Sequence, residues 1–285
     1  MRRGGIGLAL ALLAGCMPAQ PIDARPALWR VSDADTTIWL IGTIHALPSD
    51  VRWETPVVTD AIAAADTLVL EVPPATPDAH AQFETIARAP GLPPLSTRVA
   101  AADRQALVRG ITAAGLTEAD LQGYKTWGAA LVIGAASSHN SDASADRGIE
   151  PVLTARFAGK TIGALETRDG QLRLFDRLPA AAQRVLLRDA ANDAIDPARG
   201  YRTLLAAWVK GDAEALFATL ASVRNNPALA QPLIVQRNRR WARAILRRMA
   251  RPGRVLVAVG AGHLVGPGSV IDLMRARGMQ VQRIE

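Results

Sequence analysis

Two histidines close short apolar segments near opposite ends of this 285-residue chain. His45 ends a Gly-x-x-His tetrad at 42–45, after the apolar run at 37–41, and His263 ends a second one at 260–263, after the run at 255–259. Imidazole is the commonest metal ligand in proteins and a general base near neutral pH. Glycine ahead of it lets the backbone turn sharply or approach a ligand closely. The paired motifs therefore predict one site for metal binding or acid–base chemistry.

Two carboxylates follow further strand-like runs. Glu71 comes after the run at 67–70, and Glu166 comes after 160–165. Ligands of open α/β sheets bind outside the carboxyl ends of the strands, so parallel neighbouring strands would bring these carboxylates to His45 and His263. Two imidazoles and two carboxylates are a plausible shell for Zn²⁺, Mn²⁺ or Co²⁺. The same groups could instead supply a general base and a carboxylate that orients it.

One arginine interrupts an apolar helix face. In the predicted helix Leu229–Ala250, apolar residues recur at helical spacing, and Arg237 lies on their face. An inward guanidinium needs a carboxylate or a substrate anion as its partner. It could hold Glu71 or Glu166, or stabilise an oxyanion during hydrolysis. It could also extend over the edge of the core to solvent, and Glu166 could simply pair with Arg168.

The elements that must position these residues divide into two sets. Strands are predicted at both ends of the chain, and helices fill the middle. The predicted strands are Leu28–Ser32, Thr36–Ile44, Thr67–Val72, Lys160–Glu166, Arg254–Val259 and Met279–Ile284. This order predicts an α/β (α+β) fold in which one central sheet is built from both ends of the chain. A mostly helical insertion at about 79–138 is expected to cap it, within a single domain at 27–285.

The first 26 residues have the features of an export signal. A basic start precedes an apolar segment at 6–14, which is too short to span a bilayer. Leu13-Ala14-Gly15-Cys16 resembles the bacterial lipobox, so we expect removal of residues 1–15, a lipid on Cys16 and a tether at 16–26. Met17 stands where an aspartate commonly retains lipoproteins in the inner membrane. The sequence thus predicts an outer-membrane lipoprotein facing the periplasm; the alternative is an ordinary signal peptide with a chance cysteine.

Composition and missing motifs exclude several classes of function. The formal charge is +7, but no basic stripe interleaved with aromatic residues and no nucleic-acid motif accompanies it, so no nucleic-acid partner is predicted. The chain has no Gly-x-Ser-x-Gly elbow and no P-loop, which disfavours a serine hydrolase and a P-loop nucleotide enzyme.

The order of these motifs resembles the TraB/GumN family, which includes the animal Tiki proteins. The resemblance covers about Leu28 to Glu285, and its motifs are Trp39–Pro48, Leu68–Glu71, Gly163–Thr167 with Gln171 and Phe175, Arg237-Asn238 and Val259–Gly266. It implies a sheet-plus-helices fold shared more distantly with erythromycin esterases and haem-binding ChaN-like proteins. One departure is Glu150, in Gly-Ile-Glu at 148–150, where the family usually has Gly-Val-Asp.

The resemblance also implies a reaction class. Tiki proteins are metal-dependent peptidases that favour manganese or cobalt and require both Gly-x-x-His motifs and a glutamate. Carried over, His45, Glu71 and His263 would form the core of the site, with Arg237 in support. In the esterase relatives, a histidine is proposed to act as base toward water without a metal.

Three hypotheses follow for function. The first is a lipid-anchored envelope hydrolase that acts on a peptide or small acyl substrate through a divalent metal (Mn, Co or Zn) held by His45, Glu71, His263 and Glu166. The second keeps hydrolysis but uses His45 as a metal-independent base, with Glu71 as its orienting group and Arg237 as the oxyanion partner. The third is a non-catalytic protein that binds a peptide or haem.

Overall fold

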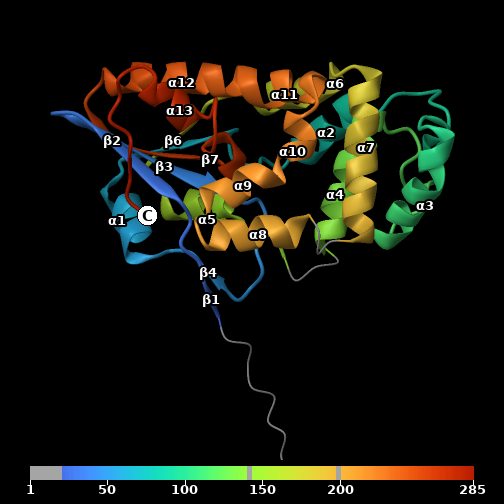
Figure 1. Ribbon diagram of the computed structural model, residues 1–285, viewed down its shortest axis with the longest axis horizontal. Coiled ribbons are helices and arrows are strands. Elements are labelled where there is room, and N and C mark those ends of the chain that lie inside the picture. Colours follow the sequence, from blue (N-terminus) through green and yellow to red (C-terminus); the bar gives the residue numbers. More distant parts are fainter. Residues whose placement is uncertain (1–20, 140–142, 197–199) are drawn as a thin grey trace, which may run out of the picture.

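The computed structural model describes residues 21–139, 143–196 and 200–285 (Figure 1). The predicted signal peptide, Cys16 and the first part of the predicted tether lie outside the described residues. Within the tether, strand β1 (Ile22–Asp23) pairs in parallel with β4 (Val51–Arg52), and Ala24 is buried. No helix in the described part of the chain is long and apolar enough to cross a bilayer.

A six-stranded mixed sheet organises the molecule, in the order β6-β5-β7-β3-β2-β8. The strands β6 (Thr161–Ala164), β5 (Thr67–Leu70), β7 (Gly253–Gly260) and β3 (Thr36–Thr43) run parallel, whereas β2 (Leu28–Ser32) and β8 (Gln282–Arg283) add antiparallel neighbours. The prediction of a mixed α/β fold with a sheet built from both ends of the chain is confirmed.

The central strands are the most apolar parts of the sheet. Strands β3 and β7 lie side by side, and most of their residues are buried. Parallel strands that are covered on both faces read as continuous apolar runs, because each face must pack against helices. The antiparallel strand β2 instead alternates buried and exposed residues over its second half. The last strand is shorter than predicted, since only Gln282 and Arg283 pair with β2.

Helices cover both faces of the sheet. Helices α12 (Gln236–Met249) and α13 (Val270–Arg275) lie on one side, and α1 (Pro56–Ala64) and α5 (Ile149–Arg156) lie on the other, with α8 (Tyr201–Val209) and α9 (Ala213–Thr219) beside them (Figure 1). Helix α1 begins after Thr55, whose hydroxyl accepts from the Val58 N–H, and Pro56 occupies its first turn.

The middle of the chain forms a helical unit with its own hydrophobic cluster. Helices α2 (Ala79–Ala87), α3 (Arg104–Ala113), α4 (Thr126–His139) and α7 (Ala180–Ile195) stand together beside the sheet (Figure 1). The short 3₁₀ turns η1 (Leu95–Thr97) and η2 (Ala101–Asp103) follow the proline-rich break. The cluster joins buried residues of α4 to Leu187 and Ala191 of α7, so the unit includes a helix beyond the predicted insertion.

The predicted helix Leu229–Ala250 is a composite. It consists of α11 (Pro227–Ala230), the π-helical segment η4 (Gln231–Val235) and α12. Pro232 lies inside the π segment, where its ring and its missing N–H are incompatible with regular α-helical hydrogen bonding. Such π segments within helices occur frequently at functional sites, and this one ends two residues before Arg237.

Other segments depart from the predicted pattern. Helix α6 (Arg168–Asp176), which was not predicted, begins after Thr167, whose hydroxyl accepts from the Gly170 N–H. The turn η3 (Ala145–Arg147) precedes α5 and is separated from it by Gly148. Helix α10 (Ala221–Arg224) and the 3₁₀ turn η5 (Ala261–His263) complete the structure.

Gly42 allows the two Gly-x-x-His motifs to lie against each other. A Cβ atom at this position would come within 2.9 Å of the Ala261 Cα atom. We predict that Gly42→Ala lowers the free energy of unfolding by about 1–3 kcal/mol, because backbone must move to accept the methyl group. Gly163→Ala on β6 is the matched control, since its Cβ would meet nothing within 4 Å. Urea unfolding checks the difference, and equal midpoints for the two variants would contradict this account of Gly42.

Candidate active site

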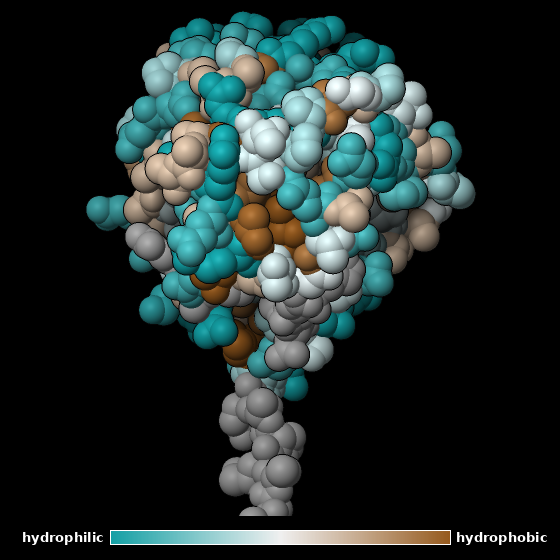
Figure 2. Space-filling model, turned by 90° about the vertical axis from the view of Figure 1, so that its right-hand side faces the viewer, coloured by the Kyte–Doolittle hydropathy of each residue, from teal (hydrophilic) through white to brown (hydrophobic). Residues whose placement is uncertain are grey.

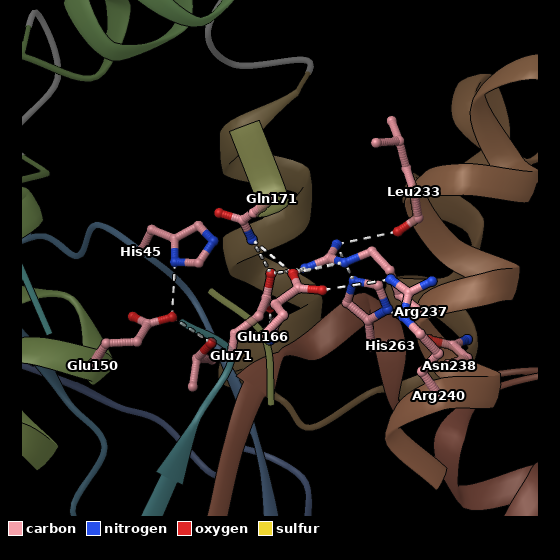
Figure 3. Close-up of polar contacts among 12 residues, drawn as sticks. His45, Glu71, Glu150, Glu166, Gln171, Leu233, Arg237, Asn238, Arg240 and His263 are labelled. Atoms are coloured by element: carbon pink, nitrogen blue, oxygen red, sulfur yellow. Dashed lines mark hydrogen bonds and ion pairs between the residues drawn. The ribbon is translucent and has the colours of Figure 1, made fainter. Parts of the chain in front are cut away.

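The carboxyl ends of the four parallel strands carry the predicted site residues. Glu71 follows β5, Glu166 lies two residues beyond β6, His45 lies two residues beyond β3, and His263 ends the turn after β7. The structure brings three of them, Glu71, Glu166 and His263, into direct contact with Arg237 (Figure 3). His45 lies on the other side of this cluster and contacts a different carboxylate, that of Glu150.

Arg237 is the centre of the buried part of the site. Its Nη2 donates to Oε1 of both Glu71 and Glu166, the latter at 2.7 Å, and its Nε donates to Glu166 Oε1 at 3.0 Å. Its Nη1 donates to the Leu233 carbonyl at 3.1 Å and lies 3.0 Å from His263 Nε2. These contacts use all five N–H groups of the guanidinium, so Arg237 has no donor left for a substrate oxyanion.

The carboxylate of Glu71 is buried but kept ionised. Oε1 accepts from Gln171 Nε2 at 2.8 Å as well as from Arg237, and Oε2 accepts from the Gly260 N–H at 3.2 Å. Burial by itself would raise the pKa of Glu71, but the charge and hydrogen bond of Arg237, together with the two nearby histidines, outweigh this effect and lower the pKa. A carboxylate with these donors stays charged at neutral pH.

His263 is buried and held as a neutral imidazole. Its Nδ1 lies 2.6 Å from Asn238 Oδ1, and Asn238 is fixed in turn by a bond from its Nδ2 to the Gly268 carbonyl. Since Arg237 can only donate to Nε2, the proton of the ring must lie on Nδ1. Burial, together with the nearby charge of Arg237, lowers the pKa of His263 to about 3. Neither ring nitrogen is available as a base in this arrangement.

His45 has the opposite environment. Its Nδ1 lies 2.8 Å from Glu150 Oε1, which also accepts from the Thr43 hydroxyl at 2.7 Å. Its side chain is 77% exposed, and Nε2 makes no hydrogen bond with the described residues. The hydrogen bond and negative charge of Glu150 raise the pKa of His45 to about 9. Of the two motif histidines, His45 alone presents a free ring nitrogen.

The loop that carries His45 is fixed on both sides. The Ile149 N–H at the start of α5 donates to the Ile44 carbonyl, and Leu47 and Ser144 exchange two backbone hydrogen bonds. From the opposite side, the Tyr201 hydroxyl of α8 donates to the Ala46 carbonyl at 2.8 Å. The first of these contacts places Glu150, the next residue of α5, against His45.

The two parts of the site face each other. Figure 3 shows the His45 ring beside the cluster of Glu71, Gln171 and Arg237. The charges of His45 and Glu71 also influence each other's pKa, which requires that they lie near one another. The site thus combines an exposed imidazole with an ionised carboxylate across a short gap.

The side chains do not fit the predicted metal site as they are arranged here. Both nitrogens of His263 are engaged by Asn238 and Arg237, and the guanidinium of Arg237 lies between Glu71 and Glu166. Within residues 21–139, 143–196 and 200–285, no group of three or more His, Cys, Asp or Glu side chains is placed to hold a metal ion. A cation shared by His45, Glu71 and His263 would have to displace these hydrogen bonds.

Three residues of the site were not assigned to it from sequence alone. Glu150 was noted only as a departure from the family pattern, and Gln171 and Asn238 only as motif positions. The signal for Asn238 was its place beside Arg237, which puts both side chains on the inner face of α12. Glu150 and Gln171 lie in helical first turns that no apolar periodicity marks, so only the fold brings them to the site.

Comparison with known proteins identifies the family of this chain. The chain belongs to the TraB/PrgY/gumN family, whose sequence profile matches residues 27–283. The family resemblance drawn from the motifs is therefore confirmed.

Two curated relatives are similar over most of their length. The Escherichia coli (strain K12) protein called "Uncharacterized protein YbaP" is 27% identical over 238 residues, which cover 83% of this chain and 87% of YbaP. The Shigella flexneri protein of the same name matches with the same identity and coverage. No solved structure gives a significant match to this chain.

Arg237→Met should leave two buried carboxylates without their main partner. We predict a loss of about 3–5 kcal/mol of stability at pH 7. The loss should shrink toward pH 4, because Glu71, whose pKa is no longer held down by Arg237, becomes neutral on protonation. Arg240→Gln is the control, since Arg240 is 44% exposed and lies 3.7 Å from Glu166; it should cost at most ~1 kcal/mol. Unfolding curves at several pH values measure both variants, and similar losses would refute the central role of Arg237.

Proposed function

We propose that this protein is a hydrolase of acyl compounds, esters or peptides, in which His45 acts as a general base toward water without a metal. The observation that carries the proposal is the His45–Glu150 pair. One ring nitrogen is fixed by a carboxylate and the other is exposed beside Glu71. This is the arrangement of an activating base and its orienting group.

The reaction assigns a role to each side of the ring. Nε2 of His45 removes a proton from water as the water oxygen attacks the acyl carbon, and the carbonyl becomes a tetrahedral oxyanion. Glu150 orients the ring and stabilises the imidazolium that forms. When the intermediate collapses, the bond to the alcohol or amine breaks, and that leaving group takes the proton from His45. Glu71 lies where it can accept a hydrogen bond from the attacking water.

Arg237 and His263 have a positioning role in this proposal. Arg237 keeps Glu71 charged and in place, and His263 accepts one of its N–H groups. The metal-dependent form of the reaction has less support, because the same contacts occupy His263 and the two carboxylates. A binding protein without turnover is the remaining alternative, and no described contact favours it.

Turnover by the purified protein tests the proposal. We expect hydrolysis of p-nitrophenyl esters or peptide p-nitroanilides that persists in EDTA and falls by ~10²–10⁴-fold in His45→Ala. Activity that needs added Mn²⁺ or Co²⁺ and disappears with EDTA would favour the metal-dependent reaction. Saturable binding of these compounds without product would favour a binding protein.

The pH profile separates His45 from other candidate bases. The rate should rise with pH and level off above about pH 9, because His45 is protonated below its raised pKa and cannot act as a base. Glu150→Gln removes the charge that raises this pKa, so the rising limb should move toward pH ~6.5, with a lower plateau. Asp146→Asn removes an exposed charge nearby and should leave the limb in place. Coincident profiles for the parent and Glu150→Gln would rule out His45 as the base.

We also propose that the protein is anchored in the bacterial cell envelope through a lipid on Cys16, at the outer membrane and facing the periplasm. The support is the sequence at 1–17 alone. Labelling of cells with a palmitate analogue should mark the parent and spare Cys16→Ser, which should be released as a soluble protein. Equal labelling of both would overturn the lipid anchor.

A further inference from the structure

An open, largely apolar pocket of about 580 Å³ lies between α4, α7, α8 and the start of α10. Its volume is within the range of ~300–1,000 Å³ that small-molecule sites occupy. Apolar side chains from all of these helices line it, including Leu131, Ala135, Leu186, Ala190, Leu204 and Leu220. Figure 2, which faces the side of the molecule formed by the helical unit, shows that hydrophobic side chains reach the surface there among hydrophilic ones.

Two walls of this pocket touch the loops of the candidate active site. Tyr201 lines the pocket and donates its hydroxyl hydrogen bond to the Ala46 carbonyl, next to His45. Leu220 lines the pocket from the other direction and packs against Gly262, where an added Cβ would come within 2.7 Å of Leu220 Cδ1. Residues of the pocket wall therefore contact both Gly-x-x-His loops.

A second pocket on the other side of α4 lacks these contacts. It has a volume of about 700 Å³ and shares Leu131 and Ala135 with the first pocket. Its other lining residues, such as Phe83 and Leu116, come from α2, from α4 and from the segment between α3 and α4. None of its lining residues contacts the loops that carry His45 or His263 in any described bond. The first pocket is thus the one that can serve the reaction.

The walls of the first pocket favour an acyl chain over an extended peptide. Helices satisfy most of their own backbone hydrogen-bonding groups, so these walls offer no strand edge to a peptide backbone. An acyl chain needs no such partners and gains free energy from each buried methylene. The small residues Gly134 and Ala135 of α4 leave room along one wall.

We propose that this pocket binds the acyl chain of the substrate, so that the proposed hydrolase acts on compounds with an unbranched chain of several methylenes next to the scissile carbonyl. The inference rests on the proposed function and assigns its substrate class. Hydrolysis would add water to the acyl carbon, break its bond to the alcohol or amine, and release the fatty acid.

Gly134 offers a direct test because it faces open space. A Cβ at this position would meet nothing within 4 Å, so larger side chains extend into the pocket without a clash with the fold. Replacing a glycine within a helix also favours folding, by ~0.5–1 kcal/mol for alanine. The series Gly134→Ala, Gly134→Leu and Gly134→Phe fills the pocket in steps. Val108→Phe adds an aromatic ring to α3 at a residue that is 49% exposed and lies outside both pockets.

Two measurements test acyl-chain binding in the pocket separately from hydrolysis at His45. The first is kcat/KM for p-nitrophenyl acetate, butanoate, hexanoate and octanoate; it should rise ~3–4-fold for each methylene that enters the pocket. The second is calorimetric binding of octanamide to the His45→Ala variant, which requires no turnover. The octanoate-to-acetate ratio and the affinity for octanamide should both fall in the order Ala, Leu, Phe at position 134 and stay unchanged in Val108→Phe.

The outcomes distinguish the acyl-pocket proposal from the hydrolase proposal. If no ester is hydrolysed, but octanamide binds and Gly134→Phe abolishes this binding, the acyl pocket stands and the hydrolase proposal fails. If esters are hydrolysed with no dependence on chain length and octanamide does not bind, the acyl pocket is overturned while the hydrolase stands. Binding that survives Gly134→Phe would also overturn it, because the chain would then lie elsewhere.

Discussion

The buried guanidinium of Arg237 is the interaction on which the site depends. Two carboxylates from neighbouring strands would repel each other in a low-dielectric interior, and each would lose hydration on burial. One guanidinium with five donors compensates both of them and fixes their positions, because its planar geometry specifies where the acceptors must lie. The ends of β5, β6 and β7 are thereby tied to a single helix, α12. The remaining strand end, that of β3, is tied through Glu150 to α5.

Two copies of one motif therefore have different chemistry. The Gly-x-x-His tetrads occupy adjacent parallel strands, yet the pKa of His45 is raised to about 9 and that of His263 is lowered to about 3. The difference comes from the partner of each ring, a partly buried carboxylate in one case and a buried arginine in the other. A motif of this kind specifies where an imidazole lies, whereas its neighbours decide whether it gains or loses a proton.

The sequence predicts the fold better than it predicts the pairings at the site. The β-branched runs before Glu71 and His263 identify parallel central strands, and the geometry of such sheets requires that their carboxyl ends meet. The position of Arg237 on an apolar helix face predicts an inward guanidinium. Sequence spacing carries no signal for the pairing of His45 with Glu150, because a hydrogen bond between a strand end and the start of α5 depends on how the loop at 44–47 folds. Helix α6 and Gln171 were missed because this helix has only nine residues and buries only Leu172, so its sequence offers few positions from which to read a helical repeat.

The π-helical segment at 231–235 has a consequence for how this chain can vary. A π turn holds one residue more than an α turn, so it is equivalent to a single-residue insertion absorbed within a helix. Without the π turn, the extra residue would rotate the rest of α12 by about 100° around its axis, the angle between successive residues of an α-helix. Arg237 and Asn238 would then point away from the strand ends. The π turn therefore lets the chain carry one more residue in this helix while Arg237 keeps the direction that its partners require.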